Sequence, residues 1–174
     1  MAKNVGYKPD KNAGYSLIEL IVIISIMAVM VGILSFGLSL MFSRDAEYVA
    51  KTIDDELAEV RMLSMSKDGV FVMKLHIDSD PSQNKIVIER GGAEYKTVDI
   101  KKSASLKVNY GTEEKTSGDV KFEFDKANGS VKAIDGDPDN AVGVCTITAT
   151  SSKLSSKTAM VDLVATTGRH YVRK

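Results

Sequence analysis

The feature that most constrains this chain is a run of 23 residues without a charge, from Leu20 to Phe42. At about 1.5 Å per residue, a helix of this length reaches roughly 35 Å, which is enough to cross a hydrocarbon core of about 30 Å with some tilt. The apolar core of a secretory signal peptide is shorter, about 7–15 residues, and its cleavage site follows the core. The run therefore predicts a single helix that spans the cytoplasmic membrane.

The charges before this run predict its orientation. Lys3, Lys8 and Lys11 precede it, against a single acid, Asp10. Cationic flanks remain on the cytoplasmic side of a membrane helix. We therefore expect the N-terminus inside and the bulk of the chain outside, in the periplasm or the extracellular space.

Beyond Phe42 the helical pattern continues without a proline or a glycine until Gly69. Apolar or small residues recur at intervals of three and four, which is typical of a helix with one buried face. They are Ala46, Val49, Ile53, Leu57, Val60 and Ser64. The pattern predicts one continuous helix from about Ser16 to Asp68. The charged residues between Asp54 and Arg61 are expected to form its solvated face.

After Gly69 the chain changes to short alternating segments separated by turn residues. Such spacing, without a second long helix, favours an antiparallel sheet or two small packed sheets, and hence an α+β fold. Hairpins are expected at Arg90-Gly91-Gly92-Ala93 and at Asn128-Gly129. The predicted strands are Val70–Ile77, Lys85–Arg90, Tyr95–Ile100, Leu106–Tyr110, Val120–Phe124, Val131–Ile134, Gly143–Thr150, Met160–Ala165 and a short one at Tyr171-Val172.

The segment before the apolar run carries a motif. Gly14 is followed by Tyr15-Ser16-Leu17-Ile18-Glu19-Leu20. This resembles type IV prepilins and type II secretion pseudopilins, in which a glycine usually precedes Phe-Thr-Leu-Ile-Glu-Leu. The two departures, Tyr15 and Ser16, keep an aromatic ring and a hydroxyl group in place. The resemblance implies a pilin-like fold with one long N-terminal helix packed on a small antiparallel β domain.

The resemblance also implies roles for three residues. A prepilin peptidase would cut between Gly14 and Tyr15 and methylate the new amine of Tyr15, and Glu19 would meet that amine on a neighbouring subunit of a helical filament. An acid inside an apolar edge is costly, which gives Glu19 a functional interpretation. The bland alternative is a glutamate that reaches the headgroups. The implied organisation is a leader at 1–14, a membrane and filament-core helix at 15–42, its amphipathic continuation at 43–68 and an extracytoplasmic β domain at 69–174.

Two C-terminal segments resemble the GspH/FimT group of minor pseudopilins. Phe124-Asp125-Lys126-Ala127-Asn128-Gly129 is similar to its hairpin, and the stretch from Val161 to Gly168-Arg169 is similar to its closing strand. This resemblance implies a minor subunit of a pilus, a competence pilus or a secretion pseudopilus, rather than the main repeat.

A calcium site is one interpretation of the loop that holds Asp135, Asp137 and Asp139. Calcium takes six to eight oxygen ligands, and carboxylates at alternate positions supply several. The twelfth position of an EF-hand counted from Asp135 is Thr146, not a glutamate, and Pro138 interrupts the pattern. A solvated turn is the alternative that the sequence favours, so no metal or other cofactor is expected.

DNA is a further partner to consider, because the chain ends in a basic and aromatic tail. Arg169, Arg173 and Lys174 could contact phosphates, and Tyr171 could stack on a base. The formal charge, however, is zero, with 23 basic and 23 acidic residues. Without residues 1–14 the counts become 20 and 22 (23 less 3, and 23 less 1), which argues against binding driven by bulk charge. The alternative is a terminal strand with solvated cations.

No catalytic constellation is evident, so we expect a protein that is not an enzyme. The two histidines, His76 and His170, are far apart in the sequence, and Cys145 lies between apolar residues as a core side chain would. A lone cysteine allows no internal disulfide. An unprocessed, membrane-anchored binding protein remains as a second interpretation of the whole chain.

Overall fold

A computed structural model describes residues 15–100, 104–152 and 157–173, with the side chains of residues 34–43 not described. Expectations that involve Lys3, Lys8, Lys11, Gly14 and Lys174 therefore lie outside the described residues. The chain divides into two compact units, residues 1–38 and residues 39–174. We describe them separately and call the second unit the head.

The only helix of more than one turn among the described residues is α1, Leu17–Ser66. Its bounds differ by one or two residues from the predicted Ser16–Asp68, a difference common at frayed helix ends. Gly69 follows with φ +113°, a conformation that L side chains rarely adopt, so the predicted helix stop is confirmed.

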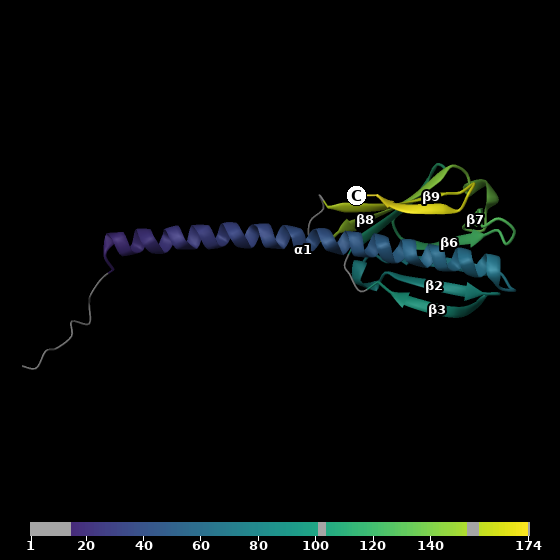
Figure 1. Ribbon diagram of the computed structural model, residues 1–174, viewed down its shortest axis with the longest axis horizontal. Helices are drawn as coiled ribbons and strands as arrows, with labels where there is room; N and C mark the ends of the chain where they lie inside the picture. The colour runs from purple at the N-terminus through teal and green to yellow at the C-terminus, as the bar shows by residue number, and fades with distance from the viewer. Residues whose placement is uncertain (1–14, 101–103, 153–156, 174) are drawn as a thin grey trace, which may run out of the picture. The chain divides into compact units, whose positions relative to one another are not determined.

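Two five-stranded antiparallel sheets form the rest of the head (Figure 1). Sheet A has the order β3-β2-β1-β6-β7 and sheet B the order β10-β9-β8-β4-β5. Short 3-10 helices η1, Pro81–Gln83, and η2, Pro138–Asn140, lie in the loops. The strands are β1 Phe71–Ile77, β2 Lys85–Arg90, β3 Ala93–Asp99, β4 Ala104–Tyr110, β5 Glu113–Lys115, β6 Gly118–Phe124, β7 Val131–Ile134, β8 Val144–Ser151, β9 Thr158–Val164 and β10 Arg169–Arg173.

Both predicted hairpins are present. Gly91 and Gly92 join β2 to β3 with φ of +59° and +84°, the paired positive values of a tight two-residue hairpin turn. Gly129, with φ +68°, lies in the turn between β6 and β7. The sequence reading missed β5, because its three residues are all charged and carry no apolar alternation.

One core cluster joins α1 to both sheets. The predicted apolar stripe of α1 is confirmed, since Val49, Ile53, Leu57 and Val60 are all fully buried. Large side chains meet them from the inner faces of the strands, for example Phe71 and Phe122 of sheet A and Ile147 of sheet B. In β1 and β8, buried positions alternate with partly exposed ones, as they do in half-buried antiparallel sheets. The α+β fold with a helix packed on antiparallel sheets is confirmed.

The expectation of a solvated charged face on α1 is wrong at most of its positions. Asp55 is exposed, but Glu56 is buried, and Asp54, Glu59 and Arg61 are only partly exposed. Apart from Asp55, these side chains contact loops and strands that follow them by 37 to 116 residues in the sequence. These side chains are wholly or partly covered because oppositely charged or hydrogen-bonding groups lie against them, which helical periodicity does not reveal.

Candidate functional site

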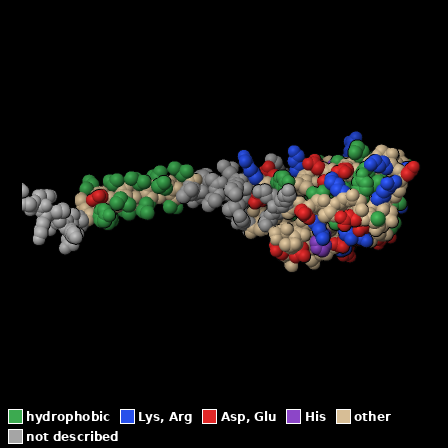
Figure 2. Space-filling view, turned by 90° about the horizontal axis from the view of Figure 1, so that it is seen from below, with side chains coloured by type: hydrophobic (Ala, Val, Ile, Leu, Met, Phe, Trp, Pro, Cys, Tyr) green, Lys and Arg blue, Asp and Glu red, His purple; other side chains and the backbone are tan. Residues whose placement is uncertain are grey.

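The first unit presents an apolar helix surface on every side. Large hydrophobic side chains along α1 are well exposed, with Ile18, Val22 and Ile33 at 70%, 50% and 69%. Figure 2 shows these side chains covering the described part of the helix. A helix that is hydrophobic all round requires cover from lipid or from other helices. In the part of the chain that the structure describes, no helix has the length and apolarity needed to span a membrane.

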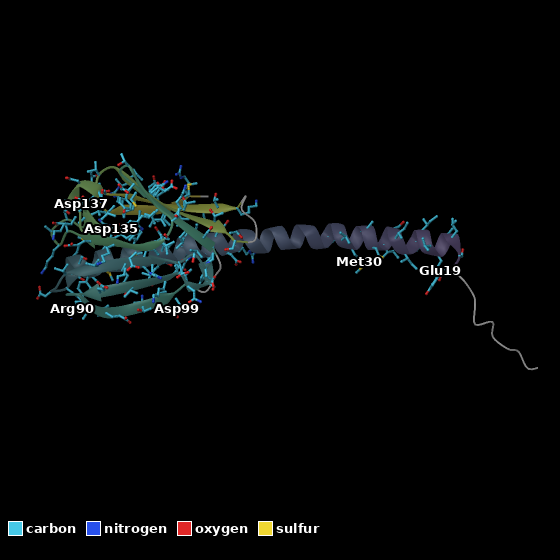
Figure 3. All side chains as sticks on the ribbon, turned by 180° about the vertical axis from the view of Figure 1, so that it is seen from behind. Glu19, Met30, Arg90, Asp99, Asp135 and Asp137 are labelled. Carbon is cyan, nitrogen blue, oxygen red and sulfur yellow. The ribbon has the colours of Figure 1, made fainter. Side chains whose placement is uncertain are left out.

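Glu19 lies in the first turn of α1, near the end of this apolar surface (Figure 3). A carboxylate is favourable there because the backbone N–H groups of a helix start carry a partial positive charge. The backbone N–H of Leu20 donates to the carbonyl of Ser16 at 3.1 Å, and Tyr15 precedes the helix with 75% of its surface exposed. Glu19 makes no hydrogen bond or ion pair with any described residue.

Within the head, α1 is attached to the edge strand β3 through a shared lysine. Nζ of Lys96 donates to both carboxylate oxygens of Glu56 at 2.9 Å and to Glu59 at 2.6 Å. Burial alone would lower the pKa of Lys96, but its hydrogen bonds to Glu59 and Glu56 outweigh burial and raise that pKa. The cluster therefore holds an edge strand against the helix by charge.

On the other side of α1, two further contacts hold the C-terminal strand. Nδ1 of His170 is 2.6 Å from Oδ1 of Asp54. Nε of Arg61 donates to the carbonyl of Gly129 at 2.9 Å, and its Nη2 donates to the carbonyl of Thr167 at 3.1 Å. The two segments that resemble the GspH/FimT group thus meet at one arginine of the helix.

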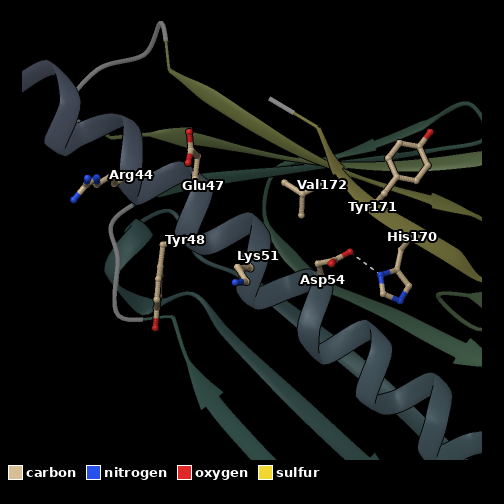
Figure 4. A pocket seen from close by; sticks show the side chains of 8 residues that line it. All are labelled: Arg44, Glu47, Tyr48, Lys51, Asp54, His170, Tyr171 and Val172. Atoms are coloured by element: carbon tan, nitrogen blue, oxygen red, sulfur yellow. Dashed lines mark hydrogen bonds and ion pairs between the residues drawn. The ribbon is translucent and has the colours of Figure 1, made fainter.

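A groove of about 600 Å³ lies between α1 and the edge strand β10 (Figure 4). Tyr48 and Tyr171 are about half exposed, while Val172 is partly buried and packs on the core. The sequence reading did not find this groove, because its walls are more than 110 residues apart in the chain. The lining residues are Arg44, Glu47, Tyr48, Lys51, Asp54, His170, Tyr171 and Val172.

The structure places three residues of the basic C-terminal tail on one face of β10. Arg169, Tyr171 and Arg173 are the exposed positions of β10, so they share the face of the strand opposite to His170 and Val172. Nε of Arg173 already pairs with Oδ2 of Asp162 at 3.1 Å. Tyr171 thus lies between the exposed Arg169 and an Arg173 that is already paired with an acid.

The three carboxylates considered as calcium ligands do not share a site: Asp135 and Asp137 bond to different groups, and the side chain of Asp139 bonds to no described residue. Oδ2 of Asp135 accepts from Tyr110 at 2.7 Å and pairs with Lys115, while its Oδ1 accepts from the backbone N–H of Lys121. Asp137 caps η2 by accepting from the N–H of Asp139. Over the described residues, no group of three or more histidine, cysteine or acidic side chains is placed to hold a metal ion.

Cys145 and His76 each lie in surroundings that indicate a structural role. Cys145 is buried in the core, and burial raises its pKa to about 12, which keeps the thiol protonated and unreactive. His76 lies 2.6 Å from Asp119, and this hydrogen bond lowers the pKa of the Asp119 carboxyl.

Comparison with known proteins gave one match. Residues 9–35 fit the profile of the prokaryotic N-terminal methylation motif, a stretch that includes Gly14, Tyr15 and Glu19. No curated protein and no solved structure matched the chain. The profile ends before the head, so the GspH/FimT branch is not confirmed. The match supports assignment to the type IV prepilin and pseudopilin superfamily, whose N-terminal methylation motif this chain carries on a pilin-like α+β fold.

Proposed function

We propose that this chain is a structural subunit of a type IV pilus, a competence pilus or a type II secretion pseudopilus. The observation that carries the proposal is the matched segment at the start of a helix that is apolar on every side. Neighbouring helices of a filament core would cover that surface. A prepilin peptidase would first remove residues 1–14, cutting between Gly14 and Tyr15, and methylate the amine of Tyr15.

Glu19 then directs docking. A carboxylate within apolar surroundings is costly until an opposite charge neutralises it. The methylated amine of Tyr15 keeps its positive charge, so the amine of a subunit already in the filament offers such a charge. Pairing favours one axial position of the incoming helix over others, because a displaced helix leaves both charges unpaired in an apolar core.

Before assembly, the subunit would cross the cytoplasmic membrane once, with its N-terminus inside. In this organisation residues 15–42 form the membrane and filament-core helix, residues 43–68 its continuation and residues 69–174 the extracytoplasmic β domain. Its partners are the peptidase, other pilin or pseudopilin subunits and the membrane. The resemblance of the C-terminal strands to the GspH/FimT group supports a minor subunit.

N-terminal sequencing and intact-mass measurement of the chain from membranes test the proposal. In cells with an active prepilin peptidase, we expect a chain that begins at a methylated Tyr15. In cells without the peptidase, we expect the full-length chain. A chain that begins at Met1 or Ala2 despite an active peptidase would favour the unprocessed, membrane-anchored binding protein instead.

A second candidate function is DNA binding during uptake, favoured by the shared exposed face of Arg169, Tyr171 and Arg173. Alternate residues of a strand are about 6.6–6.8 Å apart, so the two arginines flank the tyrosine at even intervals. A gel shift of the detergent-solubilised chain that weakens with salt, and is lost in Arg169→Ala and Arg173→Ala, would support this function. The absence of a shift at low salt would exclude it.

A further inference from the structure

Two methionines lie on the exposed side of α1 near its C-terminal end. Met62 and Met65 are 60% and 44% exposed, and both line a groove of about 310 Å³. Methionine more often fills gaps in a core, as the fully buried Met73 of β1 does. The two methionines of α1 are therefore within reach of a small oxidant in solution, and Met73 is not.

Of these two side chains, that of Met65 also touches a junction between α1 and the strands. Arg61 donates hydrogen bonds to the carbonyls of Gly129 and Thr167, and so attaches the β6–β7 turn and the segment before β10 to the helix. The carbonyl of Gly129 lies in turn against Gly168. We call Arg61, Gly129 and Gly168 the glycine junction.

The sulfur of Met65 lies beside the guanidinium group of this junction. A Cβ added at Gly129 would stand 2.6 Å from Sδ of Met65 and 2.9 Å from Nε of Arg61. Two atoms that lie this close to one point are at most 5.5 Å apart (2.6 plus 2.9). None of the three described atoms nearest to that point belongs to Met62. An oxygen atom added to the sulfur of Met65 would therefore lie within reach of Arg61.

Peroxide is the class of oxidant that adds such an oxygen. The lone pair of the thioether sulfur attacks hydrogen peroxide, the S–O bond forms, the O–O bond breaks and water leaves. The sulfur is oxidised by two electrons and the peroxide is reduced by two. The product, methionine sulfoxide, is polar, and methionine sulfoxide reductases return it to the thioether. Its oxygen accepts hydrogen bonds, which the thioether does only weakly.

We propose that Met65 is an oxidation site through which peroxide loosens the attachment of β10 and the β6–β7 turn to α1. The sulfoxide oxygen competes with the carbonyls of Gly129 and Thr167 for the hydrogen bonds of Arg61. Met62 is oxidised as well, but without this effect, because its sulfur is not beside the junction. The proposal is independent of the filament function, since it requires only the folded head and an oxidant.

Treatment of the detergent-solubilised full chain with hydrogen peroxide tests both parts of the proposal. Peptide mapping by mass spectrometry should show Met62 and Met65 converted about tenfold faster than Met73, or more, because oxidation follows exposure. The backbone N–H of Gly168 donates to the carbonyl of Val164 at 2.8 Å, and its hydrogen exchange should become several-fold faster after oxidation. Conversion of Met65 as slow as that of Met73 would overturn the site. Unchanged exchange at Gly168 after full conversion of Met65 would overturn its effect.

The matched variants Met65→Leu and Met62→Leu separate the two exposed sulfurs. Leucine keeps an apolar side chain at each position and offers the oxidant no sulfur. The acceleration of exchange at Gly168 by peroxide should persist in Met62→Leu and disappear in Met65→Leu. Equal acceleration in the two variants would overturn the role of Met65, because oxidation of some other residue would then be the cause.

Met65→Gln gives a second readout without any oxidant. The amide oxygen of glutamine accepts hydrogen bonds, as the sulfoxide oxygen does. This variant should show the faster exchange at Gly168 before treatment, and the control Met62→Gln should not. Incubation of the oxidised chain with methionine sulfoxide reductases should restore the original exchange rate. Unaltered exchange in Met65→Gln, or exchange that stays fast after the sulfoxide has been reduced, would contradict the proposal.

Discussion

Gly168 lies so close to the carbonyl oxygen of Gly129 that a Cβ added at position 168 would stand 1.8 Å from that oxygen. The same oxygen accepts a hydrogen bond from Arg61. The β6–β7 turn, the start of β10 and helix α1 therefore meet at one point, and only a residue without a side chain fits there.

Gly168→Ala should strongly destabilise the head. The substitution combines a backbone clash with φ +63°, a conformation that costs an L residue about 1–2 kcal/mol by itself. We expect a total loss of about 3 kcal/mol or more, measured as urea unfolding of the detergent-solubilised chain by circular dichroism. The control is Gly136→Ala, at φ +81° with open space around it. This control should lose only the stability that the left-handed backbone conformation costs an alanine. Equal losses of stability in the two variants would mean that the close approach of Gly168 to the Gly129 carbonyl is unimportant.

The carboxyl group of Asp135 should make the free energy of unfolding of the head depend on pH. Burial would raise its pKa, but hydrogen bonds from Lys115, Tyr110 and the backbone of Lys121 outweigh burial and hold that pKa below the ordinary 3.8. A lowered carboxyl pKa contributes stability above the unfolded value, and that stability is lost as the pH falls through the folded value.

Asp135→Asn removes this charge and retains the left-handed backbone, which asparagine tolerates well. The variant should be less stable than the unmodified chain by about 2 kcal/mol at neutral pH, a value typical of hydrogen bonds to a charged group. The difference should vanish once the pH has fallen below the lowered pKa. The side chain of Asp139 bonds to no described residue, so Asp139→Asn should change the free energy of unfolding little at any pH. A difference for Asp135→Asn that persists in strong acid would contradict the electrostatic account.

Lys96→Met should release β3 from α1. Glu56 is 11% exposed, so removing the lysine leaves an acid largely buried without its partner. We expect a loss of about 2 kcal/mol and faster hydrogen exchange in β3, with partial recovery when Glu56→Gln is added. Lys107→Met, which removes a largely exposed pair with Glu114, provides the comparison and should cost about 0.5 kcal/mol or less. Equal losses from the two lysines would show that the buried position of Glu56 has no role.

Glu19→Ala should leave cleavage after Gly14 largely intact and sharply reduce recovery of the chain in sheared filaments. Asp55→Asn removes an exposed acid farther along the same helix and serves as the control, with normal recovery expected. Immunoblots of membrane and sheared fractions measure both steps. Normal filament incorporation of Glu19→Ala would exclude its docking role.

Local patterns predicted much of this fold. Lys85–Arg90 and Val131–Ile134 are strands with the predicted bounds, and the buried positions of α1 follow the predicted stripe. The polar contacts of α1 were not predictable in the same way. Periodicity places Glu56 on a helix, but its partner Lys96 is 40 residues away, and only the packing of β3 brings the two together.

The functional sites differ in the same way: a contiguous motif can be seen in the sequence, and a site that folding assembles cannot. The Gly14–Glu19 segment is contiguous, so the sequence shows it directly, and the profile match agrees. The groove has one wall from α1 and one from β10, and residues as distant in sequence as Tyr48 and Tyr171 line it only because β10 pairs with β9 next to α1. The acids at 135, 137 and 139 show the opposite case, since their spacing resembles a ligand set while Asp135 and Asp137 bond to different groups and Asp139 bonds to no described residue.

The contacts of α1 within the head also determine how the head responds to mechanical tension. Asp54, Glu56, Glu59 and Arg61 attach two sheets and the C-terminal strand to about two turns of one helix. A pull along that helix loads these contacts and the apolar stripe between them in parallel, as shear. Rupture would then require many bonds to fail together rather than one after another, so the head should withstand tension along the helix axis better than tension applied across its strands.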